Sequence, residues 1–363
     1  MPVLFAHIEI SGKVRYNEEK SILGRAFTME YRELGSTGLK ISRLGFGGIP
    51  IQRIDAEGTR VLMHQLQEAG INFIDTARGY TVSEEYLGYA LEGIREHFVL
   101  ATKSMSRDKE GMAKDIEISL KNLRTDYIDL YQIHNPTMAQ LEQCLAPGGA
   151  LEALLEAKAA GKIGHIGLTN HSLDVFKKAL DFDWMETFMF PYSIVETQAE
   201  DLVKKCAEKG IGFICMKPLA GGAIEDATVA LRWICANDAV SVVIPGMAEP
   251  KELEQNLAAV NDTTPLTAEE KAKALEIRSE LGTNFCRRCN YCQPCAAGIN
   301  ISGCFLFDGY LSRYGLGEWA KGRYDAMGAH ASDCIGCGAC EDRCPYHLPI
   351  REMLKVVAQK FGH

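Results

Sequence analysis

The stretch INFIDTARGY, residues 71–80, shows the unit from which most of the chain is built. A short apolar run ends in polar side chains, and an amphipathic stretch with helical periodicity follows it. This alternation occurs eight times from Leu44 onward. Apolar runs that alternate with helices are typical of parallel strands joined by right-handed crossovers.

The pattern predicts a closed (β/α)8 TIM barrel, because eight such units are what that fold needs. We predict strands at 44–48, 71–75, 98–102, 127–133, 163–168, 187–190, 211–216 and 241–244, and helices between them that include 56–69, 109–123, 150–160, 198–209 and 249–259. A Gly35–Gly38 turn predicts a hairpin over 31–42, and Thr267 with Glu270 predicts a capped helix over 267–281.

A doubly wound dinucleotide-binding sheet is the alternative fold. Its fingerprint needs three spaced glycines, and the segment Gly45–Pro50 has proline where the last glycine belongs. We therefore interpret these glycines as a tight passage from a strand into a loop.

Eight of the thirteen cysteines lie in two short runs near the C-terminus. The runs are Cys286-x2-Cys289-x2-Cys292-x2-Cys295 and Cys334-x2-Cys337-x2-Cys340-x3-Cys344-Pro345. The second spacing is the one that places three thiolates on one [4Fe–4S] cluster and the fourth on another. Paired zinc ribbons are the alternative, but they use two separated C-x2-C pairs. The sequence therefore predicts two [4Fe–4S] clusters, with the first run the less regular of the two.

At 363 residues, the chain is long enough for one large domain and one small domain. We predict an N-terminal extension at 1–28, the barrel at 29–281 and a small, mainly helical iron–sulfur domain at 282–363. The aromatic segment 296–333 is interpreted as a core that shields the clusters, followed by a helix over 349–360.

The net charge of −9 gives no reason to expect nucleic-acid binding. We also see no apolar run long enough for a membrane span and no signal peptide. Thiolate clusters without an export signal predict a cytoplasmic protein.

Four polar side chains are predicted to gather at one end of the barrel, because catalytic residues follow the carboxyl ends of its strands. They are Asp75, Tyr80, Lys103 and His134. Reduction of a carbonyl needs a hydride on carbon and a proton on oxygen. A phenol is a weak acid at neutral pH, and we expect Lys103 to lower the pKa of Tyr80 into the working range. Asp75 would hold Lys103, and His134 would donate to or orient the substrate oxygen.

With these residues in place, the chain from Met29 to Asn261 resembles the aldo-keto reductase family. The tetrad is complete, and the flanking segments Asp75–Ala77, Ser83–Gly88, Ala101–Lys103 and Gly167–Asn170 are similar to those of the family. The cysteine-rich tail resembles that of a subgroup in which such a barrel is fused to a ferredoxin-like module.

The resemblance implies a nicotinamide cofactor across the barrel mouth and a small carbonyl or alcohol substrate. Asn170 matches the residue that holds the nicotinamide amide. The other residues implied in cofactor binding are Gly48, Met216, Lys217, Pro218, Leu219, Gly246 and Asn256.

Several positions depart from the family pattern. Met189 and Met216 replace the amide-binding glutamine and the stacking aromatic residue, while Gly246 and Glu252 replace two cations that many relatives use for the 2′-phosphate. Losing two cations and gaining an acid argues against NADPH selection of that kind and favours NADH or another redox partner.

Three functions remain open at this level. The clusters exchange electrons with the barrel site or with a ferredoxin-like carrier; or they are structural or sense oxidation beside an ordinary NAD(P)H-dependent carbonyl reductase; or the barrel is a degenerate scaffold for an electron-transfer module. A flavin in the phosphate groove after strands seven and eight is a variant of the first. The loop 135–150 is long enough to shape the substrate pocket.

Overall fold

The structure is a computed structural model that describes residues 5–8, 14–17, 29–281, 284–288, 290–344 and 346–362. Most of the predicted N-terminal extension therefore lies outside the described residues. Within it, the strands β1 (Phe5–Ile8) and β2 (Val14–Asn17) pair in antiparallel fashion.

Eight parallel strands form the barrel that the sequence predicts. They are β5 (Phe46–Gly47), β6 (Phe73–Asp75), β7 (Val99–Ser104), β8 (Ile128–His134), β9 (Ile163–Thr169), β10 (Thr187–Pro191), β11 (Gly212–Met216) and β12 (Val242–Ile244). Each strand pairs with its neighbour in chain order. Parallel bridges from Leu44 to Val243 and from Gly47 to Gly246 join the first strand to the last and close the ring.

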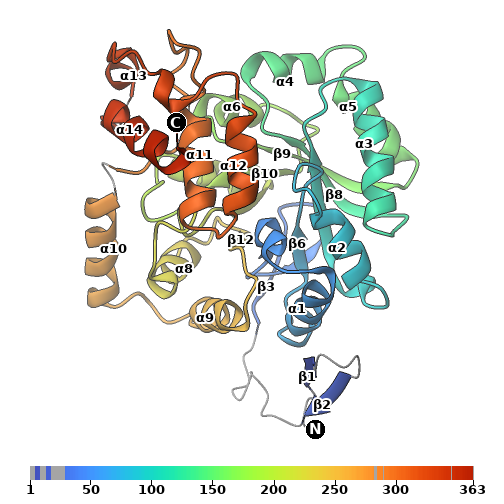
Figure 1. Ribbon diagram of the computed structural model, residues 1–363. Helices are drawn as coiled ribbons and strands as arrows, with labels where there is room; N and C mark the ends of the chain where they lie inside the picture. Colours follow the sequence, from blue (N-terminus) through green and yellow to red (C-terminus); the bar gives the residue numbers. More distant parts are fainter. Residues whose placement is uncertain are drawn as a thin grey trace.

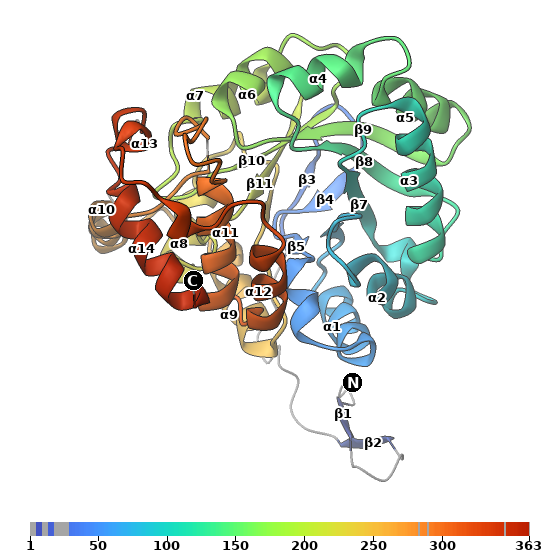
Figure 2. The same cartoon turned by 45° about the horizontal axis from the view of Figure 1, so that its top comes forward.

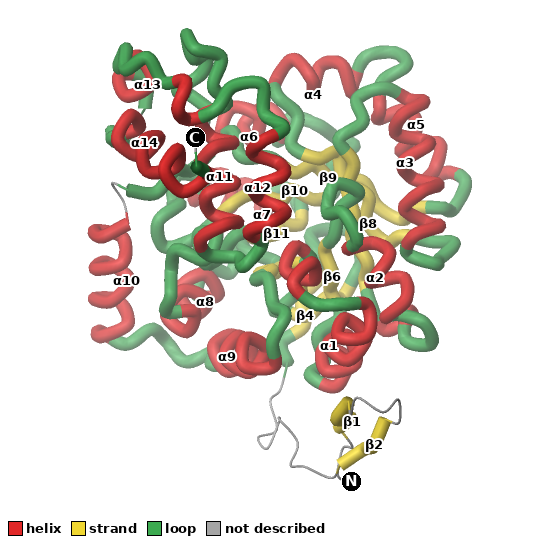
Figure 3. The backbone as a smooth tube through the Cα atoms, in the orientation of Figure 1, coloured by secondary structure: helices red, strands yellow, loops and turns green. Residues whose placement is uncertain are grey.

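Helices surround this ring, as Figure 2 shows. They are α1 (Ala56–Glu68), α2 (Ser83–Ala90), α3 (Lys109–Asn122), α4 (Met138–Leu145), α5 (Ala150–Ala159), α6 (Leu173–Ala179), α7 (Glu200–Glu208), α8 (Ala227–Cys235) and α9 (Pro250–Asn261), with short 3-10 turns at Ile49–Arg53 and Arg95–His97. Apolar side chains fill the layer between strands and helices. The tube in Figure 3 separates the inner strands from the outer helices.

The predicted hairpin closes one end of the ring. Strands β3 (Tyr31–Glu33) and β4 (Lys40–Ser42) pair in antiparallel fashion across the glycine turn. Leu34 and Ile41 are fully buried against the apolar side chains inside the barrel, among them Phe73 and Ile214.

The glycines of the first strand allow two backbones to approach closely. A Cβ on Gly47 would lie 2.9 Å from the carbonyl oxygen of Ile244, and one on Gly48 would lie 2.8 Å from that of Asp75. Both contacts are too short for a side chain. The interpretation of this segment as a tight passage from strand to loop therefore agrees with the structure.

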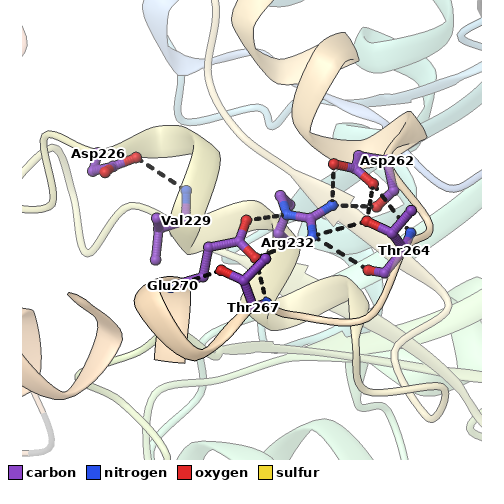
Figure 4. A network of polar contacts seen from close by, with 7 residues as sticks. All are labelled: Asp226, Val229, Arg232, Asp262, Thr264, Thr267 and Glu270. Atoms are coloured by element: carbon purple, nitrogen blue, oxygen red, sulfur yellow. Dashed lines mark hydrogen bonds and ion pairs between the residues drawn. The ribbon is translucent and has the colours of Figure 1, made fainter. Parts of the chain in front are cut away.

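Helix α10 (Ala268–Leu281) leads from the barrel toward the cysteine-rich part, and a buried arginine fixes it in place (Figure 4). Arg232 on α8 is 4% exposed and forms ion pairs with Glu270 on α10 and with Asp262 after α9. Thr267 and Glu270 cap α10 reciprocally, as predicted, with N–H···O distances of 3.1 and 2.8 Å.

The C-terminal part is helical and lies against the barrel, as the orange and red ribbon of Figure 1 shows. It contains α11 (Ile301–Ser312), α12 (Gly317–Asp325), a 3-10 turn at Ala331–Asp333, α13 (Ala339–Asp342) and α14 (Ile350–Phe361). Its apolar core includes Leu354 and Val357 of this last helix.

A second apolar cluster attaches this part to the barrel. Phe285 packs with Ile194 and Val195, which follow β10. Arg287 adds hydrogen bonds from Nε and Nη2 to the carbonyl oxygen of Val195 at 3.3 and 3.2 Å. Among the described residues, no helix combines the length and apolar character needed to cross a membrane.

Candidate active site

The four predicted catalytic residues meet at the carboxyl ends of neighbouring strands. Asp75 and His134 are the last residues of β6 and β8, Lys103 lies in β7, and Tyr80 follows β6 in a loop. The Lys103 Nζ atom is 4.9 Å from the centre of the Tyr80 ring. The rings of Tyr80 and His134 lie edge to face with their centres 6.2 Å apart.

Lys103 and Asp75 form a buried ion pair whose polar atoms are well satisfied. Lys103 donates to Asp75 Oδ2 at 2.6 Å and to the carbonyl oxygen of Thr76 at 2.8 Å. Gln132 donates to the other carboxylate oxygen at 3.3 Å. Burial raises the pKa of Asp75 and lowers the pKa of Lys103, while the attraction between the two opposes both shifts.

The environment of Tyr80 corrects one expectation from the sequence. Burial raises the pKa of Tyr80 well above its usual value, and the charge of Asp75 raises it further. Because Asp75 largely neutralises Lys103, the ammonium group does not bring the phenol pKa down into the working range as we expected. Tyr80 is therefore a protonated phenol over the neutral range.

His134 is a neutral imidazole for a related reason. Burial lowers its pKa well below the usual value, and the positive charges of Lys103, Arg107 and Lys217 lower it further. Its Nδ1 atom is buried and has no hydrogen-bond partner among the described residues. A neutral ring next to Tyr80 can donate to or accept from a substrate oxygen.

A cavity of about 160 Å³ begins at Tyr80 and Asp75 and runs along the ends of β11 and β12. Six of the predicted cofactor-binding residues line it: Gly48, Met216, Lys217, Pro218, Leu219 and Gly246. Met189 also lines it, and an ion pair of 3.1 Å between Arg53 and Glu252 lies at its wall. No residue of the 135–150 segment lines this cavity, and that segment contains helix α4 instead of a long loop.

Two predicted cofactor residues do not line the cavity. The Asn170 amide donates to the carbonyl oxygen of Pro136 at 2.8 Å and accepts from the amides of His171 and Ser172 at 2.9 and 2.8 Å. Its polar atoms therefore hold the loop after β9. Asn256 is 3% exposed within α9 and is likewise absent from the lining.

The cysteine-rich part contributes two residues to the same cavity, and sequence reasoning missed both. Arg313 and Tyr314 lie between α11 and α12 and line the cavity together with Tyr80 and Gly221. Arg313 Nε donates to the carbonyl oxygen of Gly221 at 3.0 Å. Figure 2 shows the α11–α12 pair against the barrel strands. The segment interpreted as a shield for the clusters thus also covers the barrel mouth.

Polar groups without partners surround the boundary between the two parts. Glu196, after β10, is fully buried, and neither of its carboxylate oxygens has a hydrogen-bond partner among the described residues. Three further atoms are buried without a hydrogen-bond partner among the described residues: Arg288 Nε, Arg288 Nη2 and His171 Nδ1. Burial lowers the pKa of His171 well below its usual value, and the neighbouring charges of Lys217 and Arg288 add to this.

The cysteines gather around two small cavities of about 20 Å³ each. Cys334, Cys337 and Cys340 line one of them together with Cys295 from the first run. The other is lined by Cys286, Cys292 and Cys344. Each cavity thus combines cysteines of one run with the last cysteine of the other. Cys289 lies outside the described residues.

No disulfide joins the described cysteines. In the described part of the chain, no three Cys, His, Asp or Glu side chains come together as they would around a single metal ion. A zinc ion draws its ligands to within bonding distance of one point, whereas a cubane spreads its thiolates over its corners. Both cysteine runs contribute to each of the two cavities, which is the arrangement that crossed [4Fe–4S] ligation uses.

Comparisons with known proteins agree with this arrangement. The model of the aldo/keto reductase family matches residues 43–228 and 224–278, and a 4Fe-4S dicluster domain matches residues 285–349. L-galactose dehydrogenase of Arabidopsis thaliana is 30% identical over 294 residues, which cover 66% of this chain and 90% of that protein. The NADH-specific methylglyoxal reductase of Escherichia coli is 25% identical over 323 residues, covering 67% and 98%.

Among solved structures, the holo form of aldo-keto reductase AKR11C1 from Bacillus halodurans superimposes with a TM-score of 0.61 at 28% identity, covering 69% of this chain and 96% of that one. The chain belongs to the aldo/keto reductase family. It is an oxidoreductase that carries a 4Fe-4S dicluster domain after the barrel.

Proposed function

We propose that the protein interconverts a small carbonyl compound and an alcohol at the barrel mouth, and that the iron–sulfur domain exchanges electrons with that site. The observation that carries the proposal is the placement of Tyr80, which lines the cavity beside the Lys103–Asp75 pair and the His134 ring. Tyr80 is the proton donor, the Lys103–Asp75 ion pair lies against its ring, and His134 adds a neutral ring that can form a hydrogen bond with the substrate.

Each residue of the tetrad has a defined task. Tyr80 keeps its proton because its pKa is raised by burial and by Asp75, so it donates that proton to the carbonyl oxygen during reduction. Neutral His134 orients the same oxygen. Lys103 is fixed by Asp75 and Thr76, and its charge near the ring stabilises the phenolate that forms when Tyr80 gives up its proton.

A nicotinamide cofactor fits the cavity in kind, because the Lys217 side chain lines it and its amine can pair with a phosphate group. When bound, the nicotinamide would supply or accept the hydride. Met216, Lys217, Pro218 and Leu219 would hold it along the end of β11. The cavity of about 160 Å³ is smaller than the roughly 300–1,000 Å³ of ordinary ligand sites, so it would hold only part of a dinucleotide.

We infer NADH rather than NADPH. Glu252 stands where many relatives carry a cation for the 2′-phosphate, and it accepts from the backbone amides of Ala248 and Glu249 at 2.6 and 3.0 Å. A carboxylate held in this way repels a further phosphate. The bacterial relative described as NADH-specific supports the same choice.

We further propose a crossed ligand set for two [4Fe–4S] clusters. Cys334, Cys337, Cys340 and Cys295 would hold one cluster, and the other would be held by Cys286, Cys289, Cys292 and Cys344. The cysteines that line each cavity support this assignment, and it matches the spacing in which a fourth cysteine serves the other cluster. When bound, two clusters would together accept the two electrons of one hydride, with release of a proton, and a flavin or a similar one-electron-capable group would divide the electron pair between them.

The remaining predictions form part of the same proposal. These are the domain bounds at 29–281 and 282–363, the cytoplasmic location and a ferredoxin-like carrier as electron partner. A shared cavity supports coupling between the domains, because Arg313 and Tyr314 of the iron–sulfur domain line the space that Tyr80 faces.

The substitution Tyr80→Phe tests the proposed acid. It removes the donated proton, so carbonyl turnover should fall by about 10²- to 10⁴-fold while iron content stays the same. Tyr127→Phe is the matched control, because Tyr127 lies just before the amino end of β8, away from the cavity. Retained turnover in Tyr80→Phe, measured with the same carbonyl substrate, would overturn the assignment.

A further inference from the structure

Three cations converge where the iron–sulfur domain meets the barrel: Lys217 after β11, Arg288 in the first cysteine run and Arg313 before α12. Arg288 Nη1 lies 3.8 Å from the Cβ position of Gly221, and the Tyr314 hydroxyl lies 3.6 Å from the same point. Arg313 donates to the carbonyl oxygen of Gly221. We call these three residues the junction site.

No carboxylate of the described chain neutralises the junction site directly. None of Lys217, Arg288 and Arg313 forms an ion pair with a described Asp or Glu, and the Arg288 Nε and Nη2 atoms are buried without partners there. These Arg288 atoms are the buried part of the site, because Arg313 is exposed and Lys217 is partly exposed. A buried guanidinium edge without a partner is unfavourable unless a ligand of opposite charge completes the site.

The backbone of Lys217 is strained. Its φ is +53°, in the left-handed region that side chains other than glycine rarely adopt. Such strain persists where the surrounding structure holds a residue for a task. Here the strained residue lines the cavity next to the catalytic tetrad.

Glu196 is the acid that faces these cations, and it does not satisfy them. The charges of Arg288, Lys217 and Arg287 act on its carboxylate and oppose the rise in pKa that burial causes. Neither oxygen accepts a hydrogen bond from a described residue. Burial raises the pKa of Glu196 and lowers that of Lys217, so neither charge is well compensated within the described chain.

We propose that the junction site binds an anionic oxygen group, a carboxylate or a phosphate, so that the iron–sulfur domain completes ligand binding in the barrel. The inference rests on the proposed function for the identity of the ligand, which is either the pyrophosphate of the dinucleotide or an anionic group of the substrate. Guanidinium and ammonium groups are the side chains that bind both.

The site can be tested by calorimetric titration of the anaerobically purified holoprotein with inorganic pyrophosphate. This experiment measures binding without turnover, so its result does not depend on the roles assigned to the tetrad. Lys217→Gln and Arg288→Gln should each raise the Kd about 10- to 100-fold, the range for loss of one charge-assisted contact. Lys209→Gln, an exposed lysine after α7, is the matched control and should stay within about twofold.

Two further titrations identify the source of the anion. If it is the dinucleotide, the Kd for NADH rises in Lys217→Gln by a similar factor, and 4-oxobutanoate binds no better than butanal. If it is the substrate, the NADH Kd is unchanged, and the advantage of 4-oxobutanoate over butanal is lost in the variant. Either result supports the proposal.

Two results would overturn the proposal that the junction site binds an anion. The wild-type protein could bind none of these anions, or the Lys217→Gln protein could bind all of them as tightly as the wild type does. Lys217 lies outside the cysteine runs, so that variant remains informative even if Arg288→Gln loses iron. A shift of the cluster midpoint potential in both variants, without any change in Kd, would show that the cations serve only to balance the charge of the neighbouring cluster.

Discussion

The two sides of the barrel mouth differ in whether their buried polar atoms have hydrogen-bond partners. On one side, Lys103 and Asp75 are 1% and 3% exposed and saturate each other with the help of Thr76 and Gln132. On the junction side, Glu196 and Arg288 keep buried polar atoms without described partners. The polar atoms of the first side are satisfied by other residues of the barrel. Those of the second side lie where the two domains meet, and we propose that a ligand satisfies them.

The largest expected effect follows from breaking the complete side. Lys103→Met leaves the Asp75 carboxylate buried without its cation, which destabilises by about 3–5 kcal/mol, and removes the charge that stabilises the phenolate. Carbonyl turnover should fall about 10²- to 10⁴-fold. Denaturant unfolding and steady-state rates measure the two effects.

A double variant separates stability from catalysis. Asp75→Asn with Lys103→Met removes both charges and should recover most of the lost stability, while turnover stays low. Recovery of turnover in the double variant would mean that the ion pair only supports the fold.

Cysteine substitutions extend the comparison to the metal sites. Cys344→Ser should lower the iron content by about half, because Cys344 lines the cavity of Cys286 and Cys292 and serves only that cluster. Cys304→Ser is the control, since Cys304 is fully buried in the apolar core and lines neither cavity. Loss of the cluster at Cys334–Cys340, identified by spectroscopy of the remaining cluster, would contradict the crossed assignment.

A smaller effect is expected at the residue that joins the two sides. Tyr314→Ala opens the cavity from the iron–sulfur domain and removes the ring that excludes water near Tyr80. We expect kcat/KM for carbonyl reduction to fall about tenfold. Tyr291→Ala, on the same domain but not lining this cavity, should change it by less than twofold.

The smallest effect is that of pH on kcat, which reports groups in the substrate-bound enzyme. Reduction requires protonated Tyr80 and neutral His134. The pKa of Tyr80 is raised, so its proton is lost only above about pH 10, and the pKa of His134 is lowered, so it gains a proton only below about pH 6.5. We expect kcat to vary less than about threefold between these limits. A titration midpoint near pH 8 would indicate that Lys103 does lower the pKa of Tyr80.

The sequence predicts local structure and the tetrad well, for a physical reason. Apolar runs such as Leu130–Ile133 end in polar residues, and parallel strands bring those ends together regardless of the loops. The barrel, the hairpin and the meeting of Asp75, Tyr80, Lys103 and His134 follow from that rule.

What sequence reasoning missed depends on contacts between distant segments. Arg313 and Tyr314 reach the cavity only because α11 and α12 pack over the barrel, and nothing in the local pattern of 296–333 indicates that direction. The pKa of Tyr80 depends on burial that the same packing completes, so its direction was wrong when judged from Lys103 alone. Asn170 has the expected residue type, but local backbone groups occupy its amide.

Electron exchange between the tetrad site and the clusters is the proposal on which the rest depends. Its most direct test is an anaerobic titration of the oxidised holoprotein with NADH, followed by visible absorption and by electron paramagnetic resonance. The account predicts that both clusters become reduced. Clusters that remain oxidised under NADH, in a protein that still reduces a carbonyl substrate, would contradict it.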